Sequence, residues 1–119
     1  MTPAPSFIAE LIRQKEDRQI EFLGDYQSSE ILEVICSFLN ADGGWVIIGY
    51  DGRQFCDLPV NLPEKVSELK ALINEQIFPQ PLVDVRTETY RNNQCILINV
   101  IKGARQPYSY QKKYYVRTG

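Results

Sequence analysis

The sequence predicts an α+β domain in which about three helices pack against a mixed, mostly antiparallel sheet. The first observation is the stretch 28–52, where an apolar pattern of helical spacing ends at Gly43-Gly44 and an apolar strand pattern begins at once. The second is a pair of strand-like segments, 82–90 and 94–101, separated by turn residues. At 119 residues the chain has room for one hydrophobic core. We therefore expect a single domain over residues 1–119.

Three segments carry apolar residues at helical spacing. The first helix is expected to begin after Ser6, its N-cap, and to end near residues 15–17. The second should be capped by Ser28 or Ser29 and end at 40–44, where glycine can adopt the left-handed conformation of a helix C-terminus. The third is expected from about residue 63 to residue 77, because a proline stands at its start and two prolines follow it.

The remaining periodic segments predict strands. The segment 45–50 is apolar throughout, so we expect a strand that is buried on both faces in the middle of the sheet. A short strand should precede the second helix at 19–23. The segments 82–90 and 94–101 should form a hairpin, and one final strand should lie within 107–117.

Composition excludes several classes of site. The chain has no histidine, which removes Ser-His and Cys-His catalysis and histidine metal ligands. Its three cysteines have no metal-type spacing and are typical of reduced thiols in a cytosolic protein. No signal peptide and no membrane-spanning stretch are recognisable, so we expect a cytoplasmic protein without a membrane partner.

The double glycine does not predict a nucleotide-binding loop. Gly43 and Gly44 follow the C-terminus of a helix, whose partial negative charge disfavours phosphate. A phosphate loop would instead precede a helix N-terminus, and neither Gly-rich nucleotide motif occurs in the chain.

Charge is distributed unevenly along the chain. The formal net charge is −2, yet no acid follows Glu88. Basic side chains interleaved with aromatic rings suit nucleic acid, but tyrosine is also common in strands and lysine at sheet edges, and composition leaves both interpretations open. The candidates for phosphate contact are Lys102, Arg105, Lys112, Lys113 and Arg117, and those for base stacking are Tyr108 and Tyr110.

Three carboxylates are candidates for chemistry. Glu16 and Glu21 flank the turn into the first strand, and Asp51 ends the central strand. Carboxylates gathered at strand ends can hold Mg²⁺ or Mn²⁺, which activates water and stabilises a phosphodiester transition state. The alternative from residue type alone is that all three are solvated surface charges.

The stretch 16–52, EDRQIEFL…SSEILEVICSFLNADGGWVIIGYDG, closely resembles the AlbA-like domain of the Schlafen family. That family's pattern runs E-S-x-x-x-E-F-K and then I-x-A-F-A-N-T-x-G-G-x-[LIV]-x-I-G-V-D-D. The end of the chain, with Pro107-Tyr108 and then Tyr114-Tyr115-Val116-Arg117, is similar to the closing P-Y…Y-Y-V-R-x-G. Such domains typically continue further, which suggests a fragment of a longer chain or a short member.

The resemblance implies an α+β domain associated with DNA binding. In vertebrate Schlafens, paired copies form a U-shaped, metal-dependent nuclease that acts on transfer and ribosomal RNA. Glu16 and Glu21 match the two family glutamates, and Asp51 matches the first aspartate of the G-V-D-D pair. The chain departs from the pattern at Leu23, where the family has lysine, and at Gly52, where it has the second aspartate.

Three functions are therefore weighed. The leading hypothesis is a nucleic-acid-binding domain, for RNA or DNA, that works as part of a homo-oligomer such as a dimer, or as part of a longer chain. The second is an endonuclease that uses Mg²⁺ or Mn²⁺ on Glu16, Glu21 and Asp51. The third is a non-catalytic dimerisation or protein-interaction module, whose final strand pairs with a partner at an exposed edge.

Overall fold

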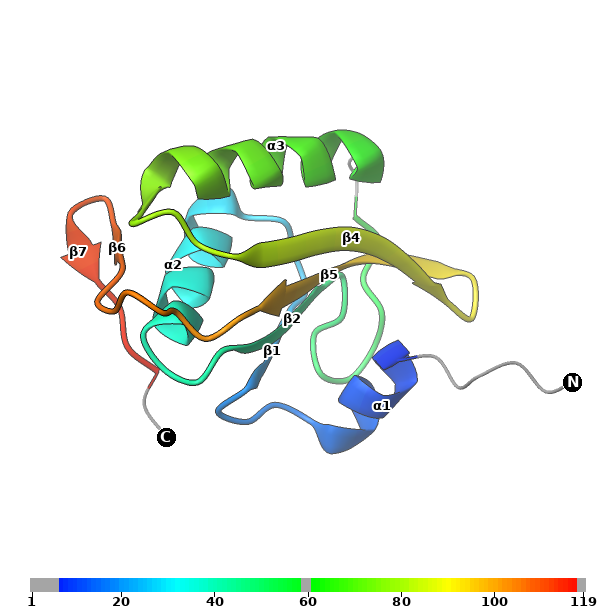
Figure 1. Ribbon diagram of the computed structural model, residues 1–119. Coiled ribbons are helices and arrows are strands. Elements are labelled where there is room, and N and C mark those ends of the chain that lie inside the picture. The colour runs from blue at the N-terminus through cyan, green and yellow to red at the C-terminus, as the bar shows by residue number, and fades with distance from the viewer. Residues whose placement is uncertain (1–6, 59–60, 118–119) are drawn as a thin grey trace, which may run out of the picture.

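The computed structural model describes residues 7–58 and 61–117 (Figure 1). No helix in these two ranges has the length and apolar character needed to cross a bilayer. Along the chain the elements are α1 (Phe7–Gln14), β1 (Ile20–Leu23), α2 (Ser28–Leu39), β2 (Gly44–Ile48), α3 (Leu62–Gln76), β3 (Ile77–Phe78), β4 (Val83–Tyr90), β5 (Asn93–Val100), β6 (Ser109–Tyr110) and β7 (Lys113–Tyr114).

The main sheet has four strands in the order β1-β2-β5-β4. β1 and β2 run parallel, whereas the pairs β2–β5 and β5–β4 are antiparallel. The predicted fold class, α+β with a mixed, mostly antiparallel sheet and three helices, is confirmed. β2 lies inside the sheet, and Val46, Ile47 and Ile48 are completely buried, as its lack of polar side chains indicates.

Helices cover both faces of this sheet (Figure 1). On one face α2 and α3 pack against residues such as Val46, Ile48 and Ile98. On the other face α1 contributes Ile8 and Leu11 to a smaller cluster with Ile47 and Leu97. Adjacent residues of β2 therefore point into different clusters, which is the two-residue period of a strand.

The junction of α2 and β2 requires its two glycines. Gly43 has φ +78°, and its N–H donates to the carbonyl oxygen of Phe38 at 3.0 Å, which ends the helix. A Cβ on Gly43 would lie 2.5 Å from the carbonyl oxygen of Val100. A Cβ on Gly44 would lie 2.5 Å from the Phe38 ring. The predicted helix stop is confirmed, and the same glycines let β2 pack closely.

Two helix starts and ends differ from the sequence prediction. The N-cap of α2 is Gln27, whose carbonyl oxygen accepts the Ile31 N–H at 2.9 Å, so the prediction of a serine cap is wrong. α1 ends at Gln14 because Lys15 adopts φ +65° and leaves the helix. The expected cap at Ser6 lies outside the described residues.

The hairpin of β4 and β5 is confirmed, and its turn is Arg91-Asn92. Both residues have positive φ, +50° and +65°, as a two-residue turn of this hairpin type requires.

The C-terminal segment differs most from expectation. Instead of one final strand it forms β6 and β7, because Gln111 and Lys112 both take positive φ and reverse the chain. β6 also pairs with β3, the two residues that follow α3 directly. These strands form a second, three-stranded sheet in the order β3-β6-β7.

Candidate carboxylate site and nucleic-acid interface

Glu16, which precedes β1, lies beside Glu21, which belongs to this edge strand of the main sheet. Glu16 is exposed, and the Glu21 side chain retains 21% of its accessible surface. A hydrogen bond with the Glu21 carboxyl group raises the pKa of Glu16 to about 7, with partial burial as the next cause. Two carboxylates this close favour sharing one proton, since both cannot be charged without repulsion.

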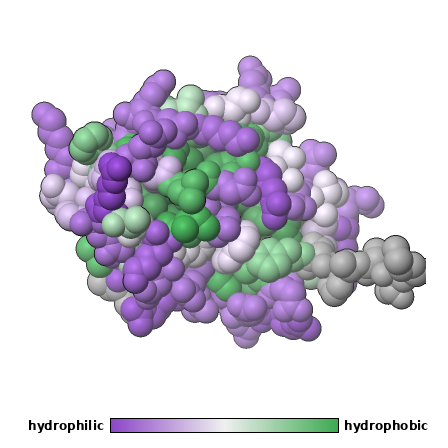
Figure 2. Space-filling view, viewed as in Figure 1, coloured by the Kyte–Doolittle hydropathy of each residue, from purple (hydrophilic) through white to green (hydrophobic). Residues whose placement is uncertain are grey.

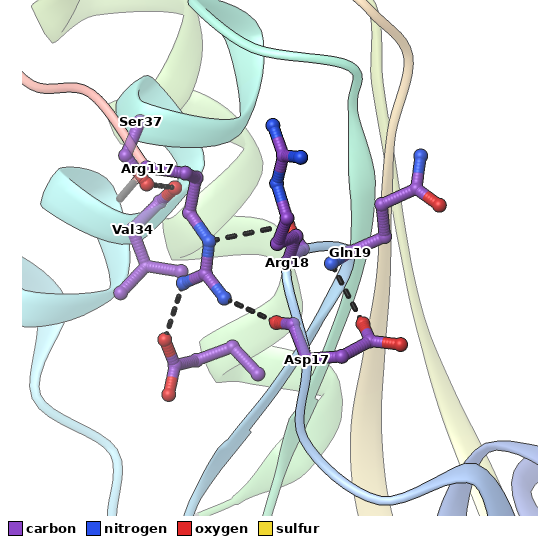
Figure 3. A network of polar contacts seen from close by, with 7 residues as sticks. Asp17, Arg18, Gln19, Val34, Ser37 and Arg117 are labelled. Atoms are coloured by element: carbon purple, nitrogen blue, oxygen red, sulfur yellow. Dashed lines mark hydrogen bonds and ion pairs between the residues drawn. The ribbon is translucent and has the colours of Figure 1, made fainter. Parts of the chain in front are cut away.

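Arg117, near the far end of the chain, binds Glu21 and the main chain of the turn before β1. Figure 3 shows its guanidinium group beside Asp17 and Arg18. Its Nη1 donates to Oε1 of Glu21 at 2.5 Å. Its Nη2 and Nε donate to the carbonyl oxygens of Asp17 and Arg18, at 2.6 and 3.3 Å. The guanidinium carbon lies 4.4 Å from the centroid of the Phe38 ring, and the side chain is 17% exposed. Arg117 is thus engaged inside the domain rather than presented to solvent.

Asp51 has a different role in the structure. It lies beyond the end of β2, and its Oδ1 accepts the N–H groups of Arg53 and Gln54 at 2.8 and 3.0 Å. The hydrogen bonds from Gln54 and Arg53 lower the pKa of Asp51, so this exposed carboxyl group is ionised and closes a turn.

The three carboxylates do not form a common ligand set as they lie. Glu21 faces Val46 across the β1–β2 ladder, whereas Asp51 follows the strand end. In the ranges 7–58 and 61–117, no three carboxylate, thiol or imidazole groups gather as a metal site would require. As they lie in this structure, Glu16, Glu21 and Asp51 do not make such a site, and the Mg²⁺ or Mn²⁺ that the resemblance implies stays a prediction.

The basic candidates fall in two places. Lys102 and Arg105 are exposed and line a groove at the end of β5. Lys112 and Lys113 are exposed at the turn between β6 and β7. Lys102 lies 3.6 Å from an oxygen of Asp42, and both side chains are about 60% exposed, so this ion pair is weak and exchangeable.

The two tyrosines considered for stacking are buried. Tyr108 and Tyr110 are 3% and 2% exposed and belong to the cluster beneath α2 and α3. Their rings pack inside the protein, so in this structure they anchor the C-terminal segment to the core and are not exposed for base stacking.

Asn40, at the end of α2, is a structural residue that sequence reasoning treated only as part of a helix stop. Its Nδ2 donates to the carbonyl oxygens of Tyr108 and Tyr115 at 2.8 and 2.9 Å, and its Oδ1 accepts the Tyr108 N–H at 2.5 Å. Nearby, Gln106 Nε2 donates to the carbonyl oxygens of Leu39 and Ala41. The end of α2 thus holds the C-terminal segment in place. The sequence signal for this role was Asn40 itself, which stands two residues after Phe38 and three before Gly43-Gly44 in the stretch that resembles the family pattern.

Solved structures with the same fold share little sequence with this chain. The N-terminal domain of a protein related to the ATP-dependent DNA helicase RecG, from Nitrosomonas europaea, superposes with a TM-score of 0.69 at 16% identity. That match covers 92% of this chain and 87% of the other. The DIP2311 protein from Corynebacterium diphtheriae gives a TM-score of 0.63 at 11% identity, over 94% of this chain and 24% of the other.

No curated protein matches the sequence. The family model described as Schlafen, AlbA_2, by contrast, matches residues 16–119, which is most of the chain. It spans Glu16, Glu21 and Asp51 as well as the basic C-terminal segment. The chain therefore belongs to the Schlafen AlbA_2 family.

Proposed function

We propose that this domain binds nucleic acid, RNA or DNA, through exposed basic side chains of its C-terminal segment. One observation carries the proposal: every charged residue after Glu88 is basic, and Lys102, Arg105, Lys112 and Lys113 are all exposed. Such side chains attract the phosphate backbone of any sequence. Arg117 is left out of this surface because its guanidinium binds Glu21 and two carbonyl oxygens.

Family membership supports the proposal, and so does a structural neighbour whose name refers to a DNA helicase. The net charge of −2 does not argue against it, because the exposed Asp42–Lys102 pair is weak and a local basic surface acts within about 8–10 Å at moderate salt.

The direct test is fluorescence anisotropy with labelled RNA and DNA at low salt. Lys102→Glu combined with Arg105→Glu should weaken binding at least tenfold, since each reversal replaces attraction to phosphate by repulsion. The control is Lys70→Glu, a charge reversal at an exposed position on α3. Equal affinity of the double variant and the wild type, or an equal loss in the α3 control, would contradict the proposal.

The endonuclease hypothesis stays a prediction. Incubating structured RNA with Mg²⁺ or Mn²⁺, beside Glu21→Gln and Asp51→Asn variants, tests it directly. Cleavage by the wild type alone would support it, whereas equal cleavage by all three proteins would assign the activity to a contaminant.

The interaction-module hypothesis also stays a prediction. Solution mass and nucleic-acid affinity measured on one sample separate it from the leading proposal. A stable oligomer that binds neither RNA nor DNA would favour pairing through a strand edge.

A further inference from the structure

A groove lies where the chain enters β4 and leaves β5. Its volume is about 500 Å³, and its walls are formed by residues 80–82 and 101–105, with Tyr108 beside them. The Ile101 N–H donates to the carbonyl oxygen of Leu82 at 3.3 Å, just past the last ladder pair, Val83 with Val100. The groove therefore begins where the two antiparallel strands end.

Two large aliphatic side chains are exposed in this groove. Leu82 is 72% exposed and Ile101 is 44% exposed. Figure 2 shows an apolar patch surrounded by polar surface over this part of the molecule, below α3. Apolar surface that gathers inside a groove is typical of a binding site, whereas single exposed aliphatic residues are not.

The floor of the groove is built with little freedom to collapse. A Cβ on Gly103 would collide with the Tyr108 ring and would lie 2.6 Å from the carbonyl oxygen of Leu39. Glycine therefore lets the loop lie flat against Tyr108, which the Asn40 side chain fixes through the main chain. The shape of the groove depends on these packed residues rather than on a loose loop.

The charge of the lining is of one sign. Among the residues that the structure describes, Lys102 and Arg105 are the only charged ones in the lining, and no carboxylate lines the groove. The ion pair of Lys102 with Asp42 is exposed, so a stronger anion can displace Asp42 from it. An occupant that complements this groove has an apolar body and adjacent negative charge, as a nucleotide has in its base and phosphates.

We propose that this groove takes one unstacked base of a single-stranded nucleic acid, against Leu82 and Ile101, with the flanking phosphates at Lys102 and Arg105. The proposal rests on the proposed function and adds that single strands bind better than duplex. In a duplex each base is stacked and paired, so it cannot enter a groove of this kind without being extruded.

The test compares the full chain with a variant that carries Leu82→Ser and Ile101→Ser, using labelled oligo(dT), oligo(U) and a duplex of the same length. The double variant should bind both single strands about tenfold more weakly, because it loses the apolar contact of one base with two aliphatic side chains, and duplex affinity should not change. Its salt dependence should match that of the wild type, because no charge is altered.

The matched control is Phe78→Ser on β3, which removes an equally exposed apolar side chain outside the groove lining. Both aliphatic positions are exposed, so the circular dichroism and urea midpoint of the variant should equal those of the wild type. Unchanged single-strand affinity, an equal loss for duplex, or an equal loss in the control would each overturn the base-binding groove while leaving nucleic-acid binding intact. Wild-type protein that binds neither strand nor duplex would overturn the proposed function and the groove together. A last outcome is that an acidic peptide binds in the groove without displacing the oligonucleotide. This result would overturn the base-binding groove and assign the site to a protein partner.

Discussion

Arg117→Ala should destabilise the fold by about 2–3 kcal/mol. The substitution removes one ion pair to Glu21 and two charged hydrogen bonds to carbonyl oxygens. Hydrogen bonds to charged groups contribute about 1.5–3 kcal/mol each when well shielded. The stacking of the guanidinium on Phe38 adds about 0.5–2 kcal/mol. The sum is reduced because the two charged side chains keep 17% and 21% of their surface exposed and the freed groups can be hydrated.

The assay is urea unfolding followed by circular dichroism, at near-neutral pH and moderate salt. In thermal unfolding, a loss of this size corresponds to a fall in Tm of roughly 8–12 °C for a chain of this length. Arg117→Lys should recover only part of the loss, because one ammonium cannot reach a carboxylate and two carbonyl oxygens at once.

The matched control for this prediction is Arg13→Ala. Arg13 pairs with Glu10 within α1, and these side chains are 72% and 41% exposed, so the expected cost is below about 0.5 kcal/mol. A loss for Arg117→Ala that is no larger than the loss for Arg13→Ala would refute the view that Arg117 ties the chain end to β1.

Three further predictions follow from the same contacts. The pKa of Glu16 is about 7 in the folded state against 4.5 in the unfolded chain, so the folded state binds more protons and its stability should fall as pH rises from about 4.5 through 7. The free energy of unfolding should therefore differ less between about pH 5 and pH 8 in Glu16→Gln than in the wild type. The same difference in both proteins would contradict the shared proton. Asn40→Ala should cost about 2–3 kcal/mol in urea unfolding, because it removes three hydrogen bonds to main-chain groups, although the Tyr108 carbonyl oxygen keeps the Cys36 thiol as a donor. A cost under about 0.5 kcal/mol would show that water replaces these hydrogen bonds. Gly44→Ala should lower Tm by several degrees, since the methyl group would meet the Phe38 ring and the Gln19 carbonyl oxygen, whereas Gly52→Ala, strained only by its φ of +99°, should lower it less.

The unit of α2 and β2 was predictable because its signals are local. The apolar spacing of α2, the double glycine and the unbroken apolar run of β2 each specify the same structure within a few residues. The hairpin of β4 and β5 was predictable for the same reason, since Arg91-Asn92 joins two periodic strands.

The C-terminal segment was not predictable from local pattern. Its short strands exist because β6 pairs with β3 and because the Asn40 side chain binds its main chain. The Gln106 side chain, within the segment, donates in turn to carbonyl oxygens at the end of α2. These partners lie 31 to 75 residues away in sequence, and no pattern in the segment itself indicates them.

The candidate site was predictable only in part. Residue type and motif indicate Glu16 and Glu21 as a pair of candidate site residues, and in the structure their carboxyl groups form a hydrogen bond. Charge alone grouped Arg117 with the other basic residues. In the structure its side chain instead binds Glu21, 96 residues away in sequence, and so stabilises the fold. Charge also could not show that Tyr108 and Tyr110 face the core, since tyrosine suits buried strands and stacking surfaces equally.

The central claim is that exposed basic side chains of the C-terminal segment bind nucleic acid. Its most direct test is the slope of the logarithm of the binding constant against the logarithm of salt concentration, measured with a single-stranded oligonucleotide. If Lys102, Arg105, Lys112 and Lys113 each contact a phosphate, the slope should be about −3. Lys112→Ala combined with Lys113→Ala should reduce it to about half that value, since two of the four contacts are lost. A slope near zero, or no binding at low salt, would contradict the claim.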